Sequence, residues 1–375
     1  MILPGKTIGI LGSGQLGRML SFVAKRMGYR VVIYSPDSQT PAGQVSDKEI
    51  VAQYQDVDAL ERFAKEVDVV TIEFENIAVE ALNALAGHVP VHPSPQVLHT
   101  SQNRLREKTF LAKAGLPVTP FKQVDSADGL KEALEHLGTP AVMKTAGFGY
   151  DGKGQAKLST LEDAHAAYTQ LGGGTVILEA FINYQLEVSV IGSRNARGDY
   201  RDFGVIENEH RDHILDLSTA PSSLTQNIQQ EAREIARATL EALDVIGVMC
   251  VEFFLTSEGK LLINEVAPRP HNSGHLTIEG CACSQFEQQL RAICNLPLGP
   301  TDIPRPTAML NLLGDVWEKG EPDWAKVLSL PETHLHLYGK AEARAKRKMG
   351  HITTVANSKG ELAQKIKTLR SIVQT

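Results

Sequence analysis

GVMCVEFFLTSEGKLLINEVAPRPHNSGH, residues 247–275, carries the clearest structural signal in the chain. It contains two runs of β-branched and apolar residues, about Val248–Leu255 and Lys260–Val266. A Thr-Ser-Glu-Gly segment that ends at Gly259 separates the two runs. Apolar runs on either side of a glycine-containing turn predict a β-hairpin.

Three polar side chains interrupt these apolar runs: Glu252, Asn264 and Glu265. A register that pairs residue 252 with 263 or 265 places both glutamates on one face of the sheet. Two carboxylates about 4–5 Å apart repel by roughly 3–4 kcal/mol at an effective dielectric constant of about 20. A protein tolerates this when one carboxyl is protonated or a cation lies between them. Because oxygen-only ligands suit Mg²⁺, the hairpin predicts a metal site at Glu252 and Glu265; an edge hairpin with a solvated face is the alternative.

The composition is that of a folded protein without a strong charge bias. The chain has 375 residues, enough for two or three domains, and 42% of them are hydrophobic. A net charge of −6 argues against a general nucleic-acid binder. The four cysteines include one pair, Cys281-x-Cys283, without a matching second pair, and they fit a reduced, cytoplasmic protein. Since neither a signal peptide nor a membrane-spanning run is evident, we expect no membrane partner.

A glycine-rich loop, Gly12–Gly17, follows an apolar strand expected over Thr7–Leu11 and opens a helix expected over Leu16–Met27. With Asp37 after the next strand, the pattern matches a dinucleotide-binding fingerprint. Any anion can use the backbone N–H groups of such a loop. The residues therefore leave a nicotinamide cofactor and another anionic ligand both open.

Glu73 and Asn76 stand at the carboxyl end of a strand expected over Val67–Glu73. Ligands of open α/β sheets bind outside the carboxyl ends of the strands, so we expect these side chains to face the same crevice as Gln15. The alternative for Asn76 is that it caps the helix expected over residues 77–85.

Lys144 and the glycine-rich segment after it predict a phosphate-binding region. An ammonium in an apolar strand needs an anionic partner, which is a phosphate or a structural glutamate. The segment Gly147–Gly154 matches a P-loop except that Gly154 replaces the Ser or Thr, and a strand rather than a helix is expected after it. We therefore expect a glycine-rich hairpin that folds over phosphates, with charge from Lys153; an ordinary flexible hairpin is the alternative.

The order of these residues along the chain resembles that of the ATP-grasp ligases. Four longer motifs, at residues 14–19, 74–76, 149–155 and 264–275, are similar to those of the N5-carboxyaminoimidazole ribonucleotide synthetases of purine biosynthesis. The resemblance covers essentially the whole chain. The departure is a valine after Glu265 where isoleucine is common.

The resemblance implies a mixed α/β and α+β fold in three parts. These are a Rossmann-like domain over residues 1–100, a split ATP-grasp domain over 101–297 and a small β-rich domain over 298–375. It also implies that the Gly12–Gly17 loop binds a ribotide and not a nicotinamide.

The resemblance further implies a ligase reaction in which ATP, bicarbonate and aminoimidazole ribonucleotide give the N5-carbamate through carboxyphosphate. Mg²⁺, or Mn²⁺ in its place, would bind Glu252 and Glu265. The implied nucleotide-binding residues are Arg104, Lys144, Gly149, Tyr150, Asp151, Gly152, Lys153, Gly154, Gln155, Glu179, Ala180, Phe181, Ile182, Glu187, His210, Asn264 and Glu265. The implied catalytic residues are Asp151, Arg269, His271 and Lys340. The implied substrate-binding residues are Gln15, Leu16, Glu73, Asn76, Tyr150, Asn272, Ser273, Lys340 and Arg347.

A basic cluster between Lys340 and Lys348 fits a single phosphate monoester, because lysine and arginine together neutralise a dianion. A solvated basic loop is the alternative. The family resemblance also leads us to expect a homodimer and a transient transfer of the product to the next enzyme, a mutase.

Three competing functions remain open at this stage. A nicotinamide oxidoreductase would explain Gly12–Gly17 but not the paired glutamates. A nucleotide-binding regulator would bind ATP without turnover. A formate- or glycine-using purine ligase would share the fold, although Tyr150-Asp151 and the segment His271–His275 favour a bicarbonate user.

Overall fold

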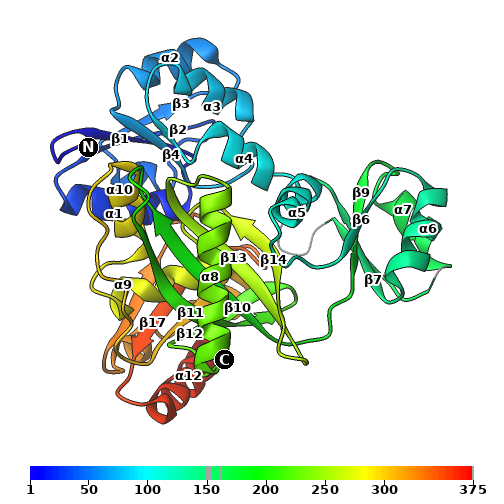
Figure 1. The fold of residues 1–375 in the computed structure, drawn as a ribbon. Helices are drawn as coiled ribbons and strands as arrows, with labels where there is room; N and C mark the ends of the chain where they lie inside the picture. The colour runs from blue at the N-terminus through cyan, green and yellow to red at the C-terminus, as the bar shows by residue number, and fades with distance from the viewer. Residues whose placement is uncertain (148–153, 161, 374–375) are drawn as a thin grey trace.

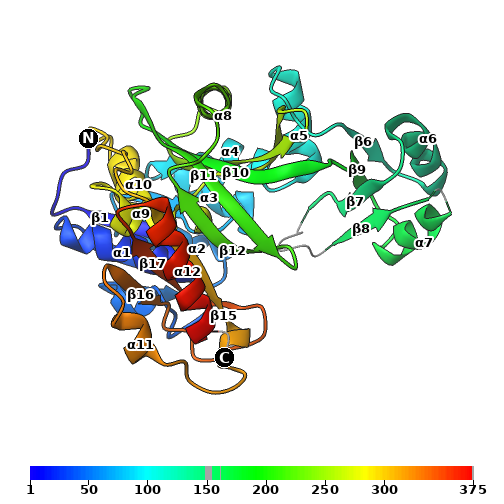
Figure 2. The same cartoon turned by 90° about the horizontal axis from the view of Figure 1, so that it is seen from below.

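The computed structural model describes residues 1–147, 154–160 and 162–373. Three sheets organise this part of the chain, and helices pack against each of them (Figure 1). Seen from below, the four-stranded sheet projects from the rest of the molecule as a separate lobe (Figure 2).

The N-terminal sheet is parallel, with strand order β3-β2-β1-β4-β5. Its strands are β1 (Thr7–Leu11), β2 (Arg30–Ser35), β3 (Lys48–Val51), β4 (Val69–Ile72) and β5 (Val91–His92). The helices of this region are α1 (Gln15–Arg26), η1 (Gly43–Val45), α2 (Val57–Ala64), α3 (Val79–Ala86) and α4 (Pro95–Ser101).

Alternate residues of these strands enter two separate cores. Ile10 and Ile33 pack on the side of α1, whereas Val32 and Tyr34 pack on the side of α2 and α3. Successive side chains of a strand point to opposite faces, so a continuous apolar run predicts a sheet covered on both sides. The distant helix α10 (Gln285–Ile293) packs beside α1 and completes the first of these cores.

The lobe contains an antiparallel sheet with order β6-β9-β7-β8. Its strands are β6 (Phe121–Val124), β7 (Ala141–Thr145), β8 (Gln155–Leu158) and β9 (Val176–Ala180). Helices α6 (Ala127–Leu137) and α7 (Asp163–Gln170) contribute to the core of the lobe. Helix α5 (Arg104–Lys113) lies where the lobe joins the body (Figure 1).

The body is built on an eight-stranded antiparallel sheet with order β14-β13-β10-β11-β12-β15-β17-β16. Its strands are β10 (Tyr184–Arg194), β11 (Tyr200–Arg211), β12 (Ile214–Ala220), β13 (Gly247–Thr256), β14 (Leu261–Ala267), β15 (Thr307–Leu313), β16 (Thr333–Leu337) and β17 (Lys348–Val355). The remaining helices are α8 (Gln226–Ala242), η2 (Asn272–Leu276), α9 (Thr277–Gly280), η3 (Gly314–Trp317), α11 (Trp324–Leu328) and α12 (Lys359–Val373). The C-terminal strands β15 to β17 therefore continue the sheet of the central region, and the domain boundaries at residues 100 and 297 stay predictions.

A few local features differ from what the sequence suggests. Asn76 does not cap α3, because that helix begins after Ala78. Val118 lies outside strand β6, which begins at Phe121, and forms an isolated bridge to Ile263. Strand β12 was not predicted, since polar residues interrupt its apolar pattern.

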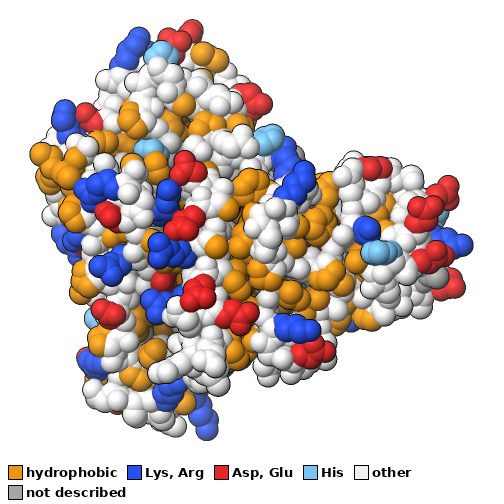
Figure 3. Space-filling model, viewed as in Figure 1, with side chains coloured by type: hydrophobic (Ala, Val, Ile, Leu, Met, Phe, Trp, Pro, Cys, Tyr) orange, Lys and Arg blue, Asp and Glu red, His pale blue; other side chains and the backbone are white. Residues whose placement is uncertain are grey.

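Among the described residues, no helix combines the length and apolar character that crossing a membrane requires. Acidic and basic side chains are interspersed on the face that Figure 3 shows, in keeping with the small net charge.

Candidate active site

A cavity of about 660 Å³ lies between the lobe, helix α5 and the hairpin of β13 and β14. Many of the predicted site residues line it. They are Asn76, Arg104, Lys144, Gln155, Glu179, Ala180, Phe181, Ile182, Glu187, His210, Glu252, Asn264, Glu265, Arg269, His271 and Asn272. The fold thus brings side chains from well-separated parts of the sequence to one cleft.

The β13–β14 hairpin has one of the two predicted registers, because Glu252 pairs directly with Glu265. The register shifts after this pair, so Asn264 is an extra residue on β14. A bulge of this kind re-aims a side chain locally. Both carboxylates lie on the same face of the sheet, as the sequence predicted.

Each of these carboxylates has a cationic or hydrogen-bonding neighbour. His271 Nε2 lies 2.8 Å from Glu252 Oε1, and Arg104 Nη1 lies 2.9 Å from Glu265 Oε2. Burial opposes ionisation of Glu265, but the charges of Arg104 and Lys144 outweigh it and lower its pKa to about 2. The repulsion expected between the two glutamates is therefore offset by separate partners.

The donor atoms beside this pair fit a hard divalent cation. Asn264 Oδ1 is buried and makes no hydrogen bond to the described residues, although a buried amide oxygen normally has a partner. Cys250, Glu252 and His271 also lie close enough to share an ion. Burial raises the pKa of the Cys250 thiol well above its usual value, so it stays protonated and is a poor ligand. Two carboxylates and one amide oxygen are the set that suits Mg²⁺.

The anionic partner of Lys144 is Glu179, which faces it from the neighbouring strand of the lobe. Lys144 Nζ lies 2.7 Å from Glu179 Oε2, and both side chains are largely buried. Lys108 Nζ lies 3.7 Å from the other carboxylate oxygen, Oε1. The structural glutamate that the sequence left open is therefore present, while Lys144 still lines the cleft.

The segment Glu179–Ile182 leaves the lobe along the wall of the cleft. The N–H groups of Ala180 and Phe181 already donate to the carbonyls of Pro120 and Pro140. An adenine edge in this position would therefore use other backbone groups of the segment. The Phe181 ring is 42% exposed, and Lys157 Nζ lies 4.1 Å from its centroid.

The predicted glycine-rich flap is only partly described. Gly149, Tyr150, Asp151, Gly152 and Lys153 lie outside the described residues. Gly154 has φ +70°, and a Cβ there would come within 2.7 Å of Thr145 Oγ1. Gln155 begins β8 and pairs with Lys144, so a strand follows the loop, which confirms that it is not a P-loop.

Glu187 and His210 form an ion pair on adjacent strands β10 and β11. His210 Nδ1 lies 2.8 Å from Glu187 Oε2. Burial alone would lower the pKa of His210, but Glu187 raises it above its usual value. This pair places a readily protonated imidazole at the wall of the cleft.

The loop after β14 is tied to the N-terminal region. Arg269 Nε lies 2.7 Å from Glu75 Oε1, in the loop after β4. Its guanidinium also donates to the carbonyl of Pro270. Arg269 and His271 therefore stand next to each other between the hairpin carboxylates and the N-terminal crevice.

A hydrogen-bonded chain runs from His271 across three adjacent strands. His271 Nδ1 lies 2.9 Å from Ser273 Oγ, and Ser273 Oγ lies 2.9 Å from Ser189 Oγ on β10. Asn208 of β11 donates to Ser189 Oγ, and Ser218 of β12 donates to Asn208 Oδ1. Ser273 is completely buried, so its hydroxyl orients His271 rather than opening into the cleft.

The glycine-rich loop of the N-terminal sheet is closed by Glu73. The two carboxylate oxygens of Glu73 accept hydrogen bonds from the N–H groups of Gly14 and Gly17. The positions that a dinucleotide pyrophosphate would use are therefore taken by a buried side chain. Gln15 begins α1 and is half-buried, whereas Leu16 packs in the core, so a ligand could reach only the backbone of Leu16. Direct substrate contacts of Glu73, Gln15 and Leu16 stay predictions.

Lys340 lies near Glu73, Arg347 and Lys348, whose charges act on its ammonium group. Its Nζ donates to the carbonyl of Lys348 at 2.6 Å. Burial, together with the positive charge of Arg347, lowers the pKa of Lys340 to about 8. Arg347 itself is exposed. Of these three basic residues, only Lys348 lines the cleft.

The sequence reasoning missed two charged side chains that line the cleft, Glu75 and Glu107, and a third, Lys108, that is buried behind it. Arg104, Glu107 and Lys108 stand at positions i, i+3 and i+4 of α5, the spacing of one helix face. Glu107 and Lys108 are buried, where an apolar stripe would be expected. Charged residues at the spacing of a buried face are the signal that could have found them.

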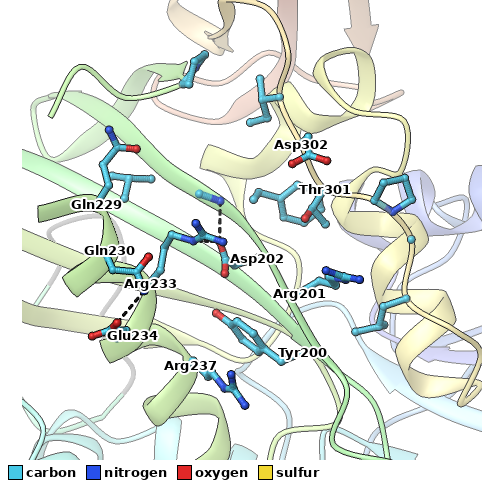
Figure 4. A pocket seen from close by; sticks show the side chains of 18 residues that line it. Tyr200, Arg201, Asp202, Gln229, Gln230, Arg233, Glu234, Arg237, Thr301 and Asp302 are labelled. Carbon is cyan, nitrogen blue, oxygen red and sulfur yellow. Dashed lines mark hydrogen bonds and ion pairs between the residues drawn. The ribbon is translucent and has the colours of Figure 1, made fainter. Parts of the chain in front are cut away.

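A second cavity of about 790 Å³ lies between α8, β11 and the segment 298–303. Figure 4 shows its polar side chains, with Arg233 directed at Asp202 and Gln230 at Glu234. None of the predicted site residues lines it. We therefore assign the chemistry to the smaller cleft.

Comparison with known protein families finds three models that match successive parts of the chain. The ribonucleotide synthetase preATP-grasp domain matches residues 5–102, and the ATP-grasp domain matches residues 109–286. The phosphoribosylaminoimidazole carboxylase C-terminal domain matches residues 307–365. The predicted fold class, with these three parts in this order, is confirmed.

Relatives and solved structures agree with these matches. The chain is 43% identical to N5-carboxyaminoimidazole ribonucleotide synthase of Bacillus subtilis, over 98% of this chain and 96% of that protein. It matches an ADP complex of an N5-carboxyaminoimidazole ribonucleotide synthetase with a TM-score of 0.94 and 44% identity, over 99% and 97% of the two chains. A synthase from Aspergillus clavatus with ADP and 5-aminoimidazole ribonucleotide matches with a TM-score of 0.90 and 34% identity, over 98% of each chain.

Proposed function

The chain belongs to the family of N5-carboxyaminoimidazole ribonucleotide synthases, and we propose on this basis what each part of its cleft does. The protein is an ATP-grasp ligase that carboxylates aminoimidazole ribonucleotide in purine biosynthesis. The oxidoreductase, the non-catalytic regulator and the formate- or glycine-using ligase are therefore wrong as alternatives. The observation that best supports the roles below is the direct pairing of Glu252 with Glu265 on the cleft face of the hairpin.

Glu252, Asn264 and Glu265 would hold Mg²⁺, or Mn²⁺ in its place. The unpartnered Oδ1 of Asn264 beside two carboxylates supports this set. The ion would supply charge neutralisation on the phosphate oxygens of the nucleotide. His271 and Arg104 pair with the two carboxylates and would share them with the ion.

The nucleotide would lie between the lobe and the hairpin. Lys144 and Arg104, which both line the cleft, would contact its phosphates, together with the predicted flap at residues 149–155. The segment 179–182 would receive the adenine, and Glu187 with His210 would form the remaining wall. Lys144 must then share or leave its contact with Glu179 when a phosphate arrives.

Bicarbonate would be the carboxyl donor. An oxygen of bicarbonate attacks the γ-phosphorus of ATP, the bond to ADP breaks, and carboxyphosphate forms. The amine of the ribotide then attacks the carboxyl carbon, the carbon–oxygen bond to phosphate breaks, and inorganic phosphate leaves. Arg269 and His271 stand beside the hairpin carboxylates, where they can donate hydrogen bonds to these anions. The proton lost by the amine would pass to Asp151.

The ribotide would bind where the N-terminal crevice meets the C-terminal region. Gln15, the backbone of Leu16, Glu73, Asn76, Tyr150, Asn272 and Ser273 would surround it. Lys340 and Arg347 would bind its phosphate, and Lys340 would also act in catalysis by orienting the ribotide. The proximity of the charges of Glu73, Lys340 and Arg347 supports this placement.

A turnover assay tests the proposed roles. Purified protein with ATP, Mg²⁺ and bicarbonate should release phosphate only when the ribotide is added. Removal of the divalent ion with a chelator should stop the release, and Mn²⁺ should restore part of it. Phosphate release that continues without ribotide or bicarbonate would contradict the proposed chemistry.

We also propose that the enzyme is a cytoplasmic homodimer that hands its product to a mutase. Membership of the family and the reduced cysteines support these points. Light scattering at assay concentrations measures the oligomeric state, and a monomer mass under turnover conditions would exclude the dimer.

A further inference from the structure

Lys108 is a fully buried lysine at the joint between the lobe and the body. It lies on α5 and is 1% exposed. A buried ammonium is costly unless it is paired and hydrogen-bonded. None of the roles proposed above uses this side chain, so its position needs another explanation.

The ammonium of Lys108 touches both halves of the cleft. Its Nζ donates to the carbonyl of Ile263 on β14 at 3.0 Å, and it lies 3.7 Å from Glu179 Oε1 on β9. Ile263 directly precedes Asn264 and Glu265. The side chain of Thr119 donates to the same carbonyl. One cation therefore connects the nucleotide strand of the lobe with the bulge that carries the metal-binding residues.

Glu179 lies between two ammonium groups that approach different oxygens. Lys144 faces Oε2 at 2.7 Å and lines the cleft, whereas Lys108 faces Oε1 and does not. When Lys144 moves toward a phosphate, the Glu179 carboxylate would remain buried without a close cation. Lys108 is placed to compensate that charge, because it stays behind the carboxylate and out of reach of the nucleotide.

We propose that Lys108 is a positioning residue of the ligase: it holds Glu179 and the β14 bulge at a fixed separation and frees Lys144 for the nucleotide phosphates. This inference rests on the proposed function of the cleft. It assigns Lys108 no contact with ATP, the ribotide or the metal ion. Its effect should therefore reach nucleotide and metal binding but not ribotide binding.

Substitution of Lys108 by methionine tests the proposal, with Lys113→Met as the matched control on the exposed side of the same helix. K108M should raise the KM for ATP and the half-saturating Mg²⁺ concentration by at least about tenfold, the cost of one lost charge-assisted hydrogen bond. The KM for the ribotide should stay within about twofold. K113M should match the wild type in all three constants.

The double variant Lys108→Met with Glu179→Gln separates charge compensation from simple packing. Glu179 belongs to the segment proposed to receive the adenine, so the double variant is compared with Glu179→Gln alone. Once the carboxylate is gone, Lys108 has no buried charge to compensate, and adding Lys108→Met to Glu179→Gln should change the KM for ATP by no more than about twofold. The double variant should also recover folding if K108M alone is unstable. If Lys108→Met raises the KM for ATP about tenfold in the Glu179→Gln background as well, the proposal is overturned. It is also overturned if K108M lowers only the amount of active enzyme and leaves the KM values unchanged.

Binding of ADP with Mg²⁺, measured by calorimetry without turnover, keeps this test apart from that of the proposed function. A wild-type protein without ribotide-dependent phosphate release would overturn the proposed function. The calorimetric comparison of K108M, K113M and the double variant would still test the positioning role of Lys108. Equal ADP affinities for K108M and the wild type would overturn the Lys108 proposal alone.

Discussion

At the scale of single residues, the cleft is organised by pairs of opposite charge. Glu252 lies against His271, Glu265 against Arg104, and Glu179 against Lys144. Each pair would exchange part of its contact for a ligand atom when substrates bind. These buried charges thus compensate one another, which avoids the cost of burying them alone.

Glu265→Gln should lower kcat by about 10²–10³-fold, because it removes one charge from the ion-binding pair at the reacting phosphate. The fold should be retained, since glutamine can still accept a hydrogen bond from Arg104. ADP release measures the effect. Glu258→Gln, in the exposed turn of the same hairpin, should leave kcat unchanged, and an E265Q enzyme with wild-type turnover would remove Glu265 from the metal site.

The pKa of Lys340, lowered by burial and by Arg347 to about 8, predicts a pH dependence of ribotide binding. Below that pKa the ammonium is charged and can bind a phosphate dianion; above it the amine is neutral and the attraction is lost. The value of kcat/KM for the ribotide should therefore fall as the pH rises through about 8.

Lys340→Arg should shift this fall to higher pH, because an arginine stays charged throughout the range. The KM for ATP serves as an internal control and should not follow the same curve. An identical pH profile for the wild type and K340R would show that another group titrates.

At the scale of elements, adjacent strands of the large sheet share a polar stripe. Ser189 on β10 pairs in register with Glu252 on β13, and Asn208 pairs with Ser218 on β12. Residues paired across strands point to the same face. The stripe therefore links the hairpin that carries Glu252 with the buried hydroxyls that orient His271.

Ser189→Ala should raise the KM for bicarbonate by about fivefold, the worth of one neutral hydrogen bond. The reason is that Ser273, which orients His271, loses the hydrogen bond to Ser189. The KM for ATP should not change. Ser371→Ala, which removes an exposed hydroxyl on α12, is the control. A loss of stability without a change in the bicarbonate KM would show that the stripe is only structural.

At the scale of the whole molecule, the N-terminal sheet is held to the body by a helix from far along the chain. Phe286 and Leu290 of α10 pack in the same core as Ile10 and Leu20. The Arg26 guanidinium pairs with Glu287 of the same helix. The ribotide site proposed between these regions depends on this docking.

Leu290→Ala should lower the free energy of unfolding by about 2–5 kcal/mol, the usual cost of a cavity at a fully buried leucine. Chemical denaturation measures the change. Leu328→Ala removes a leucine that is 56% exposed and should cost far less. Equal losses in the two variants would contradict the role of α10 in joining the regions.

Much of the fold could be predicted because its signals are local. The apolar runs of β1, β13 and β14, the glycine turn at residue 259 and the strand after Gly154 each depend on a few neighbouring residues. The prediction that Glu252 and Glu265 share one face followed from the period of two in a strand, whereas the structure decided which of the two registers is used. Asn76 as a helix cap failed because α3 begins only at Val79, with Ala78 as its N-cap.

The partners of the charged side chains could not be predicted, because they lie far apart along the chain. Arg104 and Glu265 are separated by 161 residues, and Thr71 contacts Gln289 across 218. The burial of Lys108 contradicts the usual preference of lysine for solvent. Such a position becomes understandable only when the strand that carries Glu179 is beside it.

The sequence by itself determined the residue types, their spacing and the faces on which they stand, and with them the family and the reaction. Only the tertiary structure decided which charges meet, that Glu73 closes the glycine loop and that the C-terminal strands extend the central sheet. The physical reason is that periodicity and turn chemistry act over a few residues, whereas ion pairing and burial depend on distances in space that the order of residues does not contain.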